Sequence, residues 1–365
     1  MVTERKDRIL VLGFFGLRSN TKDGQDIKTR TLYDLLCLKM PGRVILFDTE
    51  SLRFNRLNIF ILLYRILISG TVVYLPAQHN LRRFFPILFE LTRFLRIRLC
   101  YFVVGGWLPV FIKDKQRLIK RLKKIEKIFT ETTMMKHILD ANFGFQNVEV
   151  SPNFRIHDFK PQPSTGKGPL RIVFMSRIMK QKGIGMVFQY ARIAGDRVVI
   201  DFYGPVSTVD QNFFFNEIKE HSNTHYMGFL KPEHVYTTLT TYDVLVLPTG
   251  FYTEGLPGAV IDAYISGIPV VVTNWLHASE FVQDRITGFI VPFENGYARF
   301  AEALDELNLN RDLLYKMKCN ASEYSRNFSD KIAWETMRTV FENYGDKNNS
   351  SEPVLTEDKT VNLLS

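Results

Sequence analysis

The chain has 365 residues, 45% of them hydrophobic, which is enough for two domains of ordinary size with separate cores. Its three cysteines, Cys37, Cys100 and Cys319, are odd in number and widely spaced, which argues against a disulfide framework or a zinc site and fits a reducing cytoplasm. Residues 1–150 carry 26 Lys and Arg against 13 Asp and Glu, a net +13, so the formal charge of +9 is concentrated in the first half.

The basic first half restricts the classes of partner. It contains no motif of a known DNA- or RNA-binding module, and its basic residues alternate with aliphatic residues rather than with an aromatic platform, which argues against nucleic acid. Residues 84–98 and 113–127 combine basic and apolar side chains, a pattern typical of helices that lie on an anionic membrane, although a solvated helix face gives the same pattern. We expect a cytoplasmic protein that binds peripherally to the inner face of the cell membrane.

Predicted strands and helices alternate along the first 150 residues. A first helix, which Asp23 can cap, follows the first strand and a glycine turn. The strands are expected at residues 9–12, 44–47, 71–75, 101–104, 128–130 and 148–150, and further helices at 52–68, 81–98, 116–124 and 134–141. This order predicts a parallel sheet covered on both faces, and therefore a doubly wound, Rossmann-like N-terminal domain over residues 1–150.

A second domain of the same α/β class follows a linker. Residues 151–168 are rich in Pro, Gly and Ser without periodicity, which is typical of a connection between domains. Apolar strands are then expected at residues 170–175, 198–203, 243–247, 269–273 and 288–291, within a domain that spans residues 169–330. A helix in residues 331–345 is predicted to cross back to the first domain, and the polar residues 346–365 are predicted to form a disordered tail.

The segment 245–269 concentrates the features of a ligand site. A buried strand ends at Pro248 and Gly250, and in α/β sheets ligands bind at the carboxyl ends of strands. Glu254 follows in the loop, and a helix is expected from Pro257 to about Gly267. The unpaired N–H groups at the start of that helix would face the same pocket as the Glu254 carboxylate, which suits a ligand with both hydroxyls and negative charge, such as a phosphorylated sugar.

Two motifs in the second half carry a resemblance to a known family. Glu254, the Gly-Leu-Pro-Gly that follows it and Asp262 resemble the E-x7-E signature of the family four retaining glycosyltransferases, or group 1 glycosyltransferases, which have the GT-B fold. Asp262 departs from the signature because the family has Glu there. Arg177, four residues, and then Lys182-Gly183 look like the diphosphate clamp of the same family. The resemblance implies two Rossmann-like domains that face each other across a cleft.

The resemblance also implies roles for individual residues. Glu254 would hold the donor sugar and act in catalysis with Arg177 and Lys182, while Asp262 would contact the nucleotide ribose. The other donor-binding candidates are Gly16, Gly204, Gly228, Gly255, Leu256 and Pro257, and the acceptor-side candidates are Gln78, His79 and Trp107. Gly13, Lys28 and Arg30 are further candidates, with turn glycines and helix-surface charges as the alternatives. Many relatives place a histidine or aspartate after the strand at 101–104, where this chain has Gly105-Gly106.

The implied activity is transfer of a sugar from a nucleotide diphosphate sugar to an acceptor hydroxyl with retention at the anomeric carbon, in the assembly of a bacterial surface polysaccharide such as capsule, O-antigen or exopolysaccharide. The acceptor would be a lipid-linked sugar or an oligosaccharide. No cofactor or metal is expected, because Asp48-Thr49-Glu50 is the nearest approach to a D-x-D metal motif. A nucleotide-sugar 2-epimerase of the same fold and a non-catalytic sugar-nucleotide-binding subunit are the alternatives.

Overall fold

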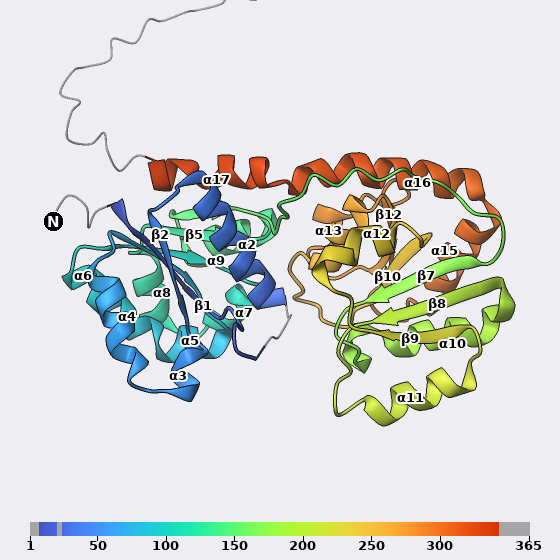
Figure 1. The fold of residues 1–365 in the computed structure, drawn as a ribbon, viewed down its shortest axis with the longest axis horizontal. Coiled ribbons are helices and arrows are strands. Elements are labelled where there is room, and N and C mark those ends of the chain that lie inside the picture. The colour runs from blue at the N-terminus through green and yellow to red at the C-terminus, as the bar shows by residue number, and fades with distance from the viewer. Residues whose placement is uncertain (1–6, 20–23, 343–365) are drawn as a thin grey trace, which may run out of the picture.

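The computed structural model describes residues 7–19 and 24–342, and it consists of two α/β domains that face each other (Figure 1). Each domain is built on a six-stranded sheet in which every paired strand is parallel. Parallel strands are covered on both faces, so their sequences are almost continuously apolar, which is the pattern that predicted them. The predicted α/β class with two doubly wound domains is confirmed.

The N-terminal sheet has the strand order β2-β1-β3-β4-β5-β6. Its strands are β1 (Ile9–Gly13), β2 (Val44–Asp48), β3 (Thr71–Leu75), β4 (Arg98–Phe102), β5 (Lys127–Thr130) and β6 (Val148–Val150). The last residue of β1, Gly13, is in register with Asp48 on one side and Leu75 on the other. The carboxyl ends of neighbouring strands therefore lie at one edge of the sheet.

The helices of this domain differ in three places from the prediction, which has no helix between residues 98 and 116. They are α2 (Gly24–Lys39), α3 (Ser51–Phe54), α4 (Asn58–Leu67), α5 (Gln78–Arg83), α6 (Phe85–Phe94), α7 (Leu108–Ile112), α8 (Gln116–Leu122) and α9 (Thr133–Phe143). The helix predicted over 52–68 is divided because Asn55 is extended, with φ −144° and ψ 113°. The helix predicted over 81–98 is also wrong, because Arg96 has a positive φ of 55° and Arg98 already starts β4. The predicted cap residue Asp23 lies outside the described residues.

The C-terminal sheet has the order β12-β11-β10-β7-β8-β9. Its strands are β7 (Leu170–Met175), β8 (Val198–Tyr203), β9 (Thr224–Gly228), β10 (Val244–Leu247), β11 (Val270–Thr273) and β12 (Gly288–Val291). The helices are α10 (Ile184–Ala194), α11 (Gln211–Glu220), α12 (Val235–Leu239), α13 (Gly258–Ile265), α14 (Ala278–Phe281), α15 (Tyr297–Leu309) and α16 (Arg311–Tyr324). Helix α16, which has buried Leu314 and Met317 on one face, was not predicted from the sequence.

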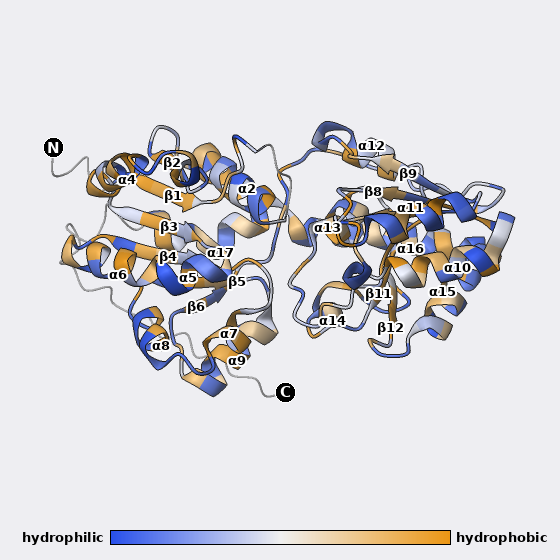
Figure 2. Ribbon diagram, turned by 90° about the horizontal axis from the view of Figure 1, so that it is seen from below, coloured by the Kyte–Doolittle hydropathy of each residue, from blue (hydrophilic) through white to orange (hydrophobic). Residues whose placement is uncertain are grey.

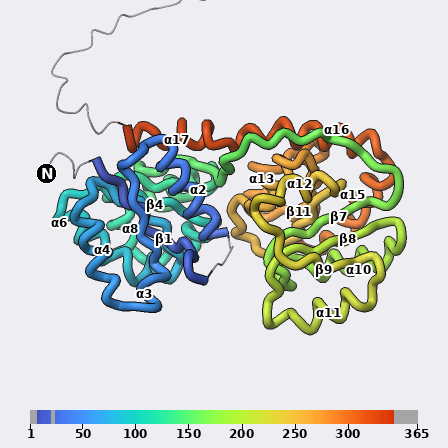
Figure 3. The backbone as a smooth tube through the Cα atoms, viewed as in Figure 1, coloured from blue at the N-terminus to red at the C-terminus, as the bar shows by residue number. Residues whose placement is uncertain are grey.

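Two segments connect the domains along the same face of the molecule (Figure 3). The linker that follows β6 pairs with the chain before α17 (Asp330–Glu342) through a bridge between Arg155 and Ser329. From there α17 reaches the N-terminal domain, where its residues Trp334, Met337 and Phe341 share a hydrophobic cluster with strand β1. The predicted tail, residues 346–365, lies outside the described residues.

Within the described residues, every helix is too short or too polar to cross a lipid bilayer.

Candidate active site

A cavity of about 550 Å³ lies between the two domains. Its lining comes from loops at the carboxyl ends of strands in both domains and from the first residues of helices α2 and α13. The N-terminal domain contributes Gly24, Gln25, Ile27, Arg30, Thr31, Val104, Gly105 and Glu131, and the C-terminal domain contributes Ser176, Arg177, Lys182, Tyr203, Gly204, Phe229, Glu254, Gly255, Leu256, Pro257, Gly258, Ala259 and Asp262, among others. The volume is within the range of sites that hold a ligand of several rings.

The three residues predicted to be catalytic all line this cavity. The Nζ atom of Lys182 lies 2.5 Å from Oε2 of Glu254, and the side chains of Lys182 and Glu254 are 14% and 19% exposed. The hydroxyl of Thr249 donates to the same carboxylate oxygen at 3.3 Å. Arg177 adds a second, exposed cation to the lining. A carboxylate and two cations therefore face one cavity.

Backbone contacts between two loops bring Lys182 and Glu254 together. The amide N–H of Gly250, in the loop after β10, donates to the carbonyl of Gln181 at 2.7 Å. Gly183 has a φ of +87°, and a Cβ there would lie 2.0 Å from the carbonyl oxygen of Pro248. Only glycine permits both the left-handed backbone and this close approach. The glycine of the Lys-Gly motif thus sets the position of the lysine before it.

The start of helix α13 forms the opposite part of the lining, with Pro257 as its N-cap residue. The preceding Leu256 is held from both sides. Its N–H donates to Oε2 of Glu131 at 3.0 Å, and its carbonyl accepts from Nδ2 of Asn153 at 3.3 Å. Because the first N–H groups of a helix lack intrahelical partners, this end of α13 favours an anionic ligand in the cavity.

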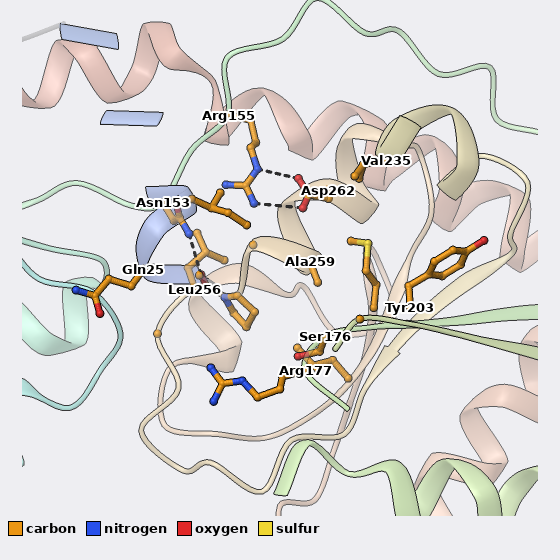
Figure 4. Close-up of a pocket in the computed structure, with 18 of the residues that line it drawn as sticks. Gln25, Asn153, Arg155, Ser176, Arg177, Tyr203, Val235, Leu256, Ala259 and Asp262 are labelled. Carbon is orange, nitrogen blue, oxygen red and sulfur yellow. Dashed lines mark hydrogen bonds and ion pairs between the residues drawn. The ribbon is translucent and has the colours of Figure 1, made fainter. Parts of the chain in front are cut away.

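Asp262, the residue that departs from the family signature, is bound by Arg155 of the linker (Figure 4). Nε of Arg155 donates to Oδ1 at 2.8 Å and Nη2 donates to Oδ2 at 3.2 Å. Burial of the guanidinium opposes its charge, but the Asp262 carboxylate outweighs burial and holds the pKa of Arg155 above its ordinary value. Asp262 therefore lines the cavity while it is paired with Arg155. This ion pair was not predicted from the sequence.

Glu131, at the end of β5, connects the domains. Its Oε1 atom lies 2.6 Å from Nζ of Lys28, and both side chains are nearly completely buried. Lys28 Nζ also donates to the carbonyl of Val103 at 2.9 Å. The other carboxylate oxygen accepts the N–H of Leu256 from the opposite domain. Lys28 is thus a buried partner of Glu131, and the alternative reading of Lys28 as a helix-surface charge is wrong.

A second contact between the domains lies at α9. The Glu280 carboxylate accepts the N–H groups of Thr133 and Met134, at 2.6 and 3.0 Å. Burial opposes ionisation, but these bonds and the neighbouring His277 outweigh it and hold the pKa of Glu280 below its ordinary value. His277 is buried against Gly106, where a Cβ would lie 2.9 Å from the imidazole Nε2. In this chain the space beside Gly106 is therefore filled by a histidine from the other domain.

Asp48 and Glu50, the nearest approach to a metal motif, bind backbone N–H groups instead. Asp48 accepts from Phe15 and Leu17, each at 3.1 Å, and Glu50 accepts from Arg18 at 3.1 Å. These bonds fix the loop that follows β1. Among the described residues, the one group with the geometry of a metal site is Glu217, Glu220 and His221, which lies at α11 and outside the cavity lining.

The remaining predicted residues divide between the cavity and other places. Gly204 and Arg30 line the cavity, and Arg30 donates to the carbonyls of Phe15 and Gly16 at 2.7 and 3.0 Å. The structure does not bring seven of the candidates into the lining: Gly13, Gly16, Lys28, Gly228, Gln78, His79 and Trp107. The Trp107 ring instead packs edge-on against Phe111, and its Nε1 donates to the carbonyl of Val104 at 2.7 Å.

The fold is shared with HepE of Anabaena, whose crystal structure is in complex with UDP-glucose. The TM-score is 0.73 at 13% identity, over 92% of this chain and 99% of that one. The likeness shows that this protein has the GT-B fold.

Residues 156–326 match the family described as glycosyl transferases group 1. The match covers most of the C-terminal domain, and the resemblance predicted from the sequence is confirmed there.

Two curated relatives show how far the sequence similarity extends. The capsular polysaccharide biosynthesis glycosyltransferase CapM of Staphylococcus aureus is 27% identical over 183 residues, which cover 47% of this chain and 46% of CapM. The amylovoran biosynthesis glycosyltransferase AmsK of Erwinia amylovora is 22% identical over 183 residues, which cover 48% of this chain and 45% of AmsK. The matches thus span about half the length of these two relatives.

Proposed function

We propose that this protein is a retaining glycosyltransferase that moves a sugar from a nucleotide diphosphate sugar to an acceptor hydroxyl. The observation that carries the proposal is the convergence of Glu254, Lys182, Arg177 and the start of α13 on one cavity. A carboxylate suits the hydroxyls of the donor sugar, and the two cations and the helix end suit its diphosphate. Asp262, with Arg155 bound to it, would meet the ribose.

In the proposed reaction the bond between the anomeric carbon and the diphosphate oxygen breaks, and the acceptor oxygen forms a bond to the same face of that carbon. The acceptor proton passes to the departing diphosphate oxygen, because positions 105 and 106 after strand β4 are glycines and His277, which fills the space beside Gly106, does not line the cavity. Arg177 and Lys182 stabilise negative charge that grows on the diphosphate as the bond breaks, so they act mainly in the transition state. We propose that these cations act without a divalent metal, and turnover is then expected to be unchanged by a chelator.

The setting that we propose is the cytoplasmic side of the cell membrane, in the assembly of a bacterial surface polysaccharide on a lipid-linked or oligosaccharide acceptor. Two observations support it. Both CapM and AmsK are named for polysaccharide biosynthesis, and the three cysteines, Cys37, Cys100 and Cys319, are free thiols.

One experiment tests the activity. The full-length protein is incubated with UDP-, GDP- and other activated sugars, each with and without oligosaccharide and lipid-linked acceptors, and free nucleotide, isomerised sugar and glycosylated acceptor are followed. Acceptor-dependent release of nucleotide with a new glycosidic bond is expected. Isomerised sugar without an acceptor would show a 2-epimerase, and binding without any conversion would show a non-catalytic subunit. Either of those results would overturn the proposal.

A further inference from the structure

Helices α3 and α4 present an apolar surface to solvent. Seven hydrophobic side chains on or between these two short helices are exposed, among them Leu57 at 67% and Phe60 at 66%: Phe54, Leu57, Phe60, Ile61, Leu63, Tyr64 and Leu67, here called the α3–α4 surface. Scattered hydrophobic residues are common on proteins, but a contiguous group of this kind marks a site of interaction.

Helix α4 has apolar side chains on both its inner and its outer side. Leu62 and Ile66 point inward and belong to the core of the N-terminal domain. Phe60, Tyr64 and Leu67 are spaced by four and three residues, so they share the opposite side of the helix. Figure 2 shows α4 as an apolar helix at the outer edge of this domain. A helix that is apolar on its outer as well as its inner face needs a partner that buries the outer one.

The residues around this surface are basic. Between positions 51 and 98 the sequence has eight arginines, one glutamate, and no aspartate or lysine. The exposed side chains of this stretch include Arg53 and Arg56 beside α3, and Arg93 and Arg96 at the end of α6. The neighbouring helix α6 adds the exposed apolar residues Ile87 and Phe94. The α3–α4 surface and α6 thus carry exposed apolar side chains together with exposed arginines.

We propose that the α3–α4 surface docks this protein on an anionic lipid bilayer. Its aromatic and aliphatic side chains would enter the region between headgroups and acyl chains, while the arginines bind lipid phosphates. A symmetric contact between two copies would bring their arginines together, which disfavours self-association through this surface. The sequence pointed to residues 84–98 and 113–127 for membrane contact, and the structure adds α3 and α4 as the elements that insert.

The surface is connected to the cavity. The guanidinium of Arg18 lies 5.1 Å from the ring centroid of Phe54, and that of Arg53 lies 5.6 Å from the ring centroid of Phe14. These contacts tie α3 to the loop between β1 and α2, and the first residues of α2 line the cavity. Docking would therefore place the N-terminal side of the cavity near the bilayer, within reach of an acceptor anchored there. Lipid binding itself does not depend on the proposed transfer reaction.

The test is cosedimentation of the full-length protein with vesicles, without donor or acceptor. Vesicles of phosphatidylglycerol and phosphatidylcholine are compared with vesicles of phosphatidylcholine alone. The Phe60→Ser/Tyr64→Ser variant is expected to lose about tenfold or more in partitioning to the anionic vesicles, because two large apolar side chains no longer enter the bilayer. The matched control is Val209→Ser/Leu309→Ser, which changes side chains that are 89% and 81% exposed in the C-terminal domain and should bind as the wild type does.

A second variant reports insertion directly. Phe60→Trp keeps an apolar side chain at the centre of the surface, and its fluorescence should shift to the blue when anionic vesicles are added. The proposal would be overturned if the wild-type protein bound neither kind of vesicle. It would also be overturned if the wild type and the Phe60→Ser/Tyr64→Ser variant bound anionic vesicles equally. Self-association of the wild type in the absence of lipid, abolished in that variant and without vesicle binding, would also overturn it and would assign the surface to a second copy of this chain.

Discussion

The guanidinium of Arg155 binds both carboxylate oxygens of Asp262, at 2.8 and 3.2 Å, in a site where the two side chains are 10% and 13% exposed. Arg155 belongs to the linker between the domains, and Asp262 belongs to helix α13 of the C-terminal domain. The pair therefore fixes the linker to the helix whose first residues line the cavity. It also determines which lone pairs of Asp262 remain for a ligand.

Arg155→Ala is expected to lower the free energy of unfolding by about 3 kcal/mol, because it leaves the Asp262 carboxylate buried without its partner. The measurement is urea unfolding, together with UDP affinity by calorimetry. The Arg155→Met/Asp262→Leu double variant removes both charges, so it should recover most of the stability but not the affinity for UDP. Unchanged stability in Arg155→Ala would show that the pair contributes little to the fold.

Glu254 and Lys182 are the second pair to test. Glu254→Ala should abolish transfer with a smaller loss of unfolding free energy than Arg155→Ala, because the Lys182 ammonium that loses its partner lines the cavity and can be solvated there. Lys182→Ala and Arg177→Ala should lower turnover by about two orders of magnitude, with smaller effects on donor affinity, because the charge that they stabilise develops in the transition state. The readout is nucleotide release against donor concentration.

Lys180 provides the matched control for these variants. It lies two residues before Lys182 and is exposed, but its ammonium sits 4.5 Å from the ring centroid of Phe213, and it does not line the cavity. The Lys180→Ala variant should therefore release nucleotide at the same rate as the wild type. Full activity in both Glu254→Ala and Arg177→Ala would remove these residues from the site.

The third prediction concerns Gly255, which packs closely against the N-terminal domain. A Cβ on Gly255 would lie 2.0 Å from Oε2 of Glu131 and 2.9 Å from the Cα of Gly105. Gly255→Ala should therefore force the domains apart and reduce turnover, while UDP still binds to the C-terminal domain. Small-angle scattering should show a larger radius of gyration. Gly185→Ala is the control, because nothing lies within 4 Å of the added Cβ. An unchanged radius and turnover in Gly255→Ala would contradict the proposed role of this contact.

The sequence predicted the features that depend on local pattern. Strands β7 and β12 have the predicted bounds, because buried parallel strands are short apolar runs with clear ends. The meeting of Glu254 with Lys182 also followed from sequence, since both residues come after neighbouring strands of one sheet. The division of α3 from α4 depends on one extended residue, Asn55, for which hydrophobic periodicity gives no signal.

Contacts between the domains could not be predicted in the same way. No sequence motif surrounds Glu131, Arg155 or His277. Each of them contacts residues that are distant in sequence, so these contacts form only when the segments pack together. The sequence made Lys28 a candidate site residue because of its charge. A lysine on a predicted helix, however, gives no indication that it will be buried against Glu131. Similarly, the glycines after β4 indicated a missing side chain without indicating that His277 would fill the space.

The contact of Glu280 with the first residues of α9 predicts how stability depends on pH. The pKa of Glu280 in the folded protein is lowered, so its contribution is present above the unfolded pKa of about 4.3 and is lost as the pH falls through the lower folded value. The wild type should therefore lose thermal stability below about pH 4.5 more steeply than Glu280→Gln, which keeps the shape of the side chain and leaves His277 in place. The check is the melting temperature of both proteins measured across this range. Glu302→Gln, which changes a carboxylate that is 60% exposed, should follow the wild type. Parallel pH profiles for wild type and Glu280→Gln would show that this carboxylate does not hold the domains together.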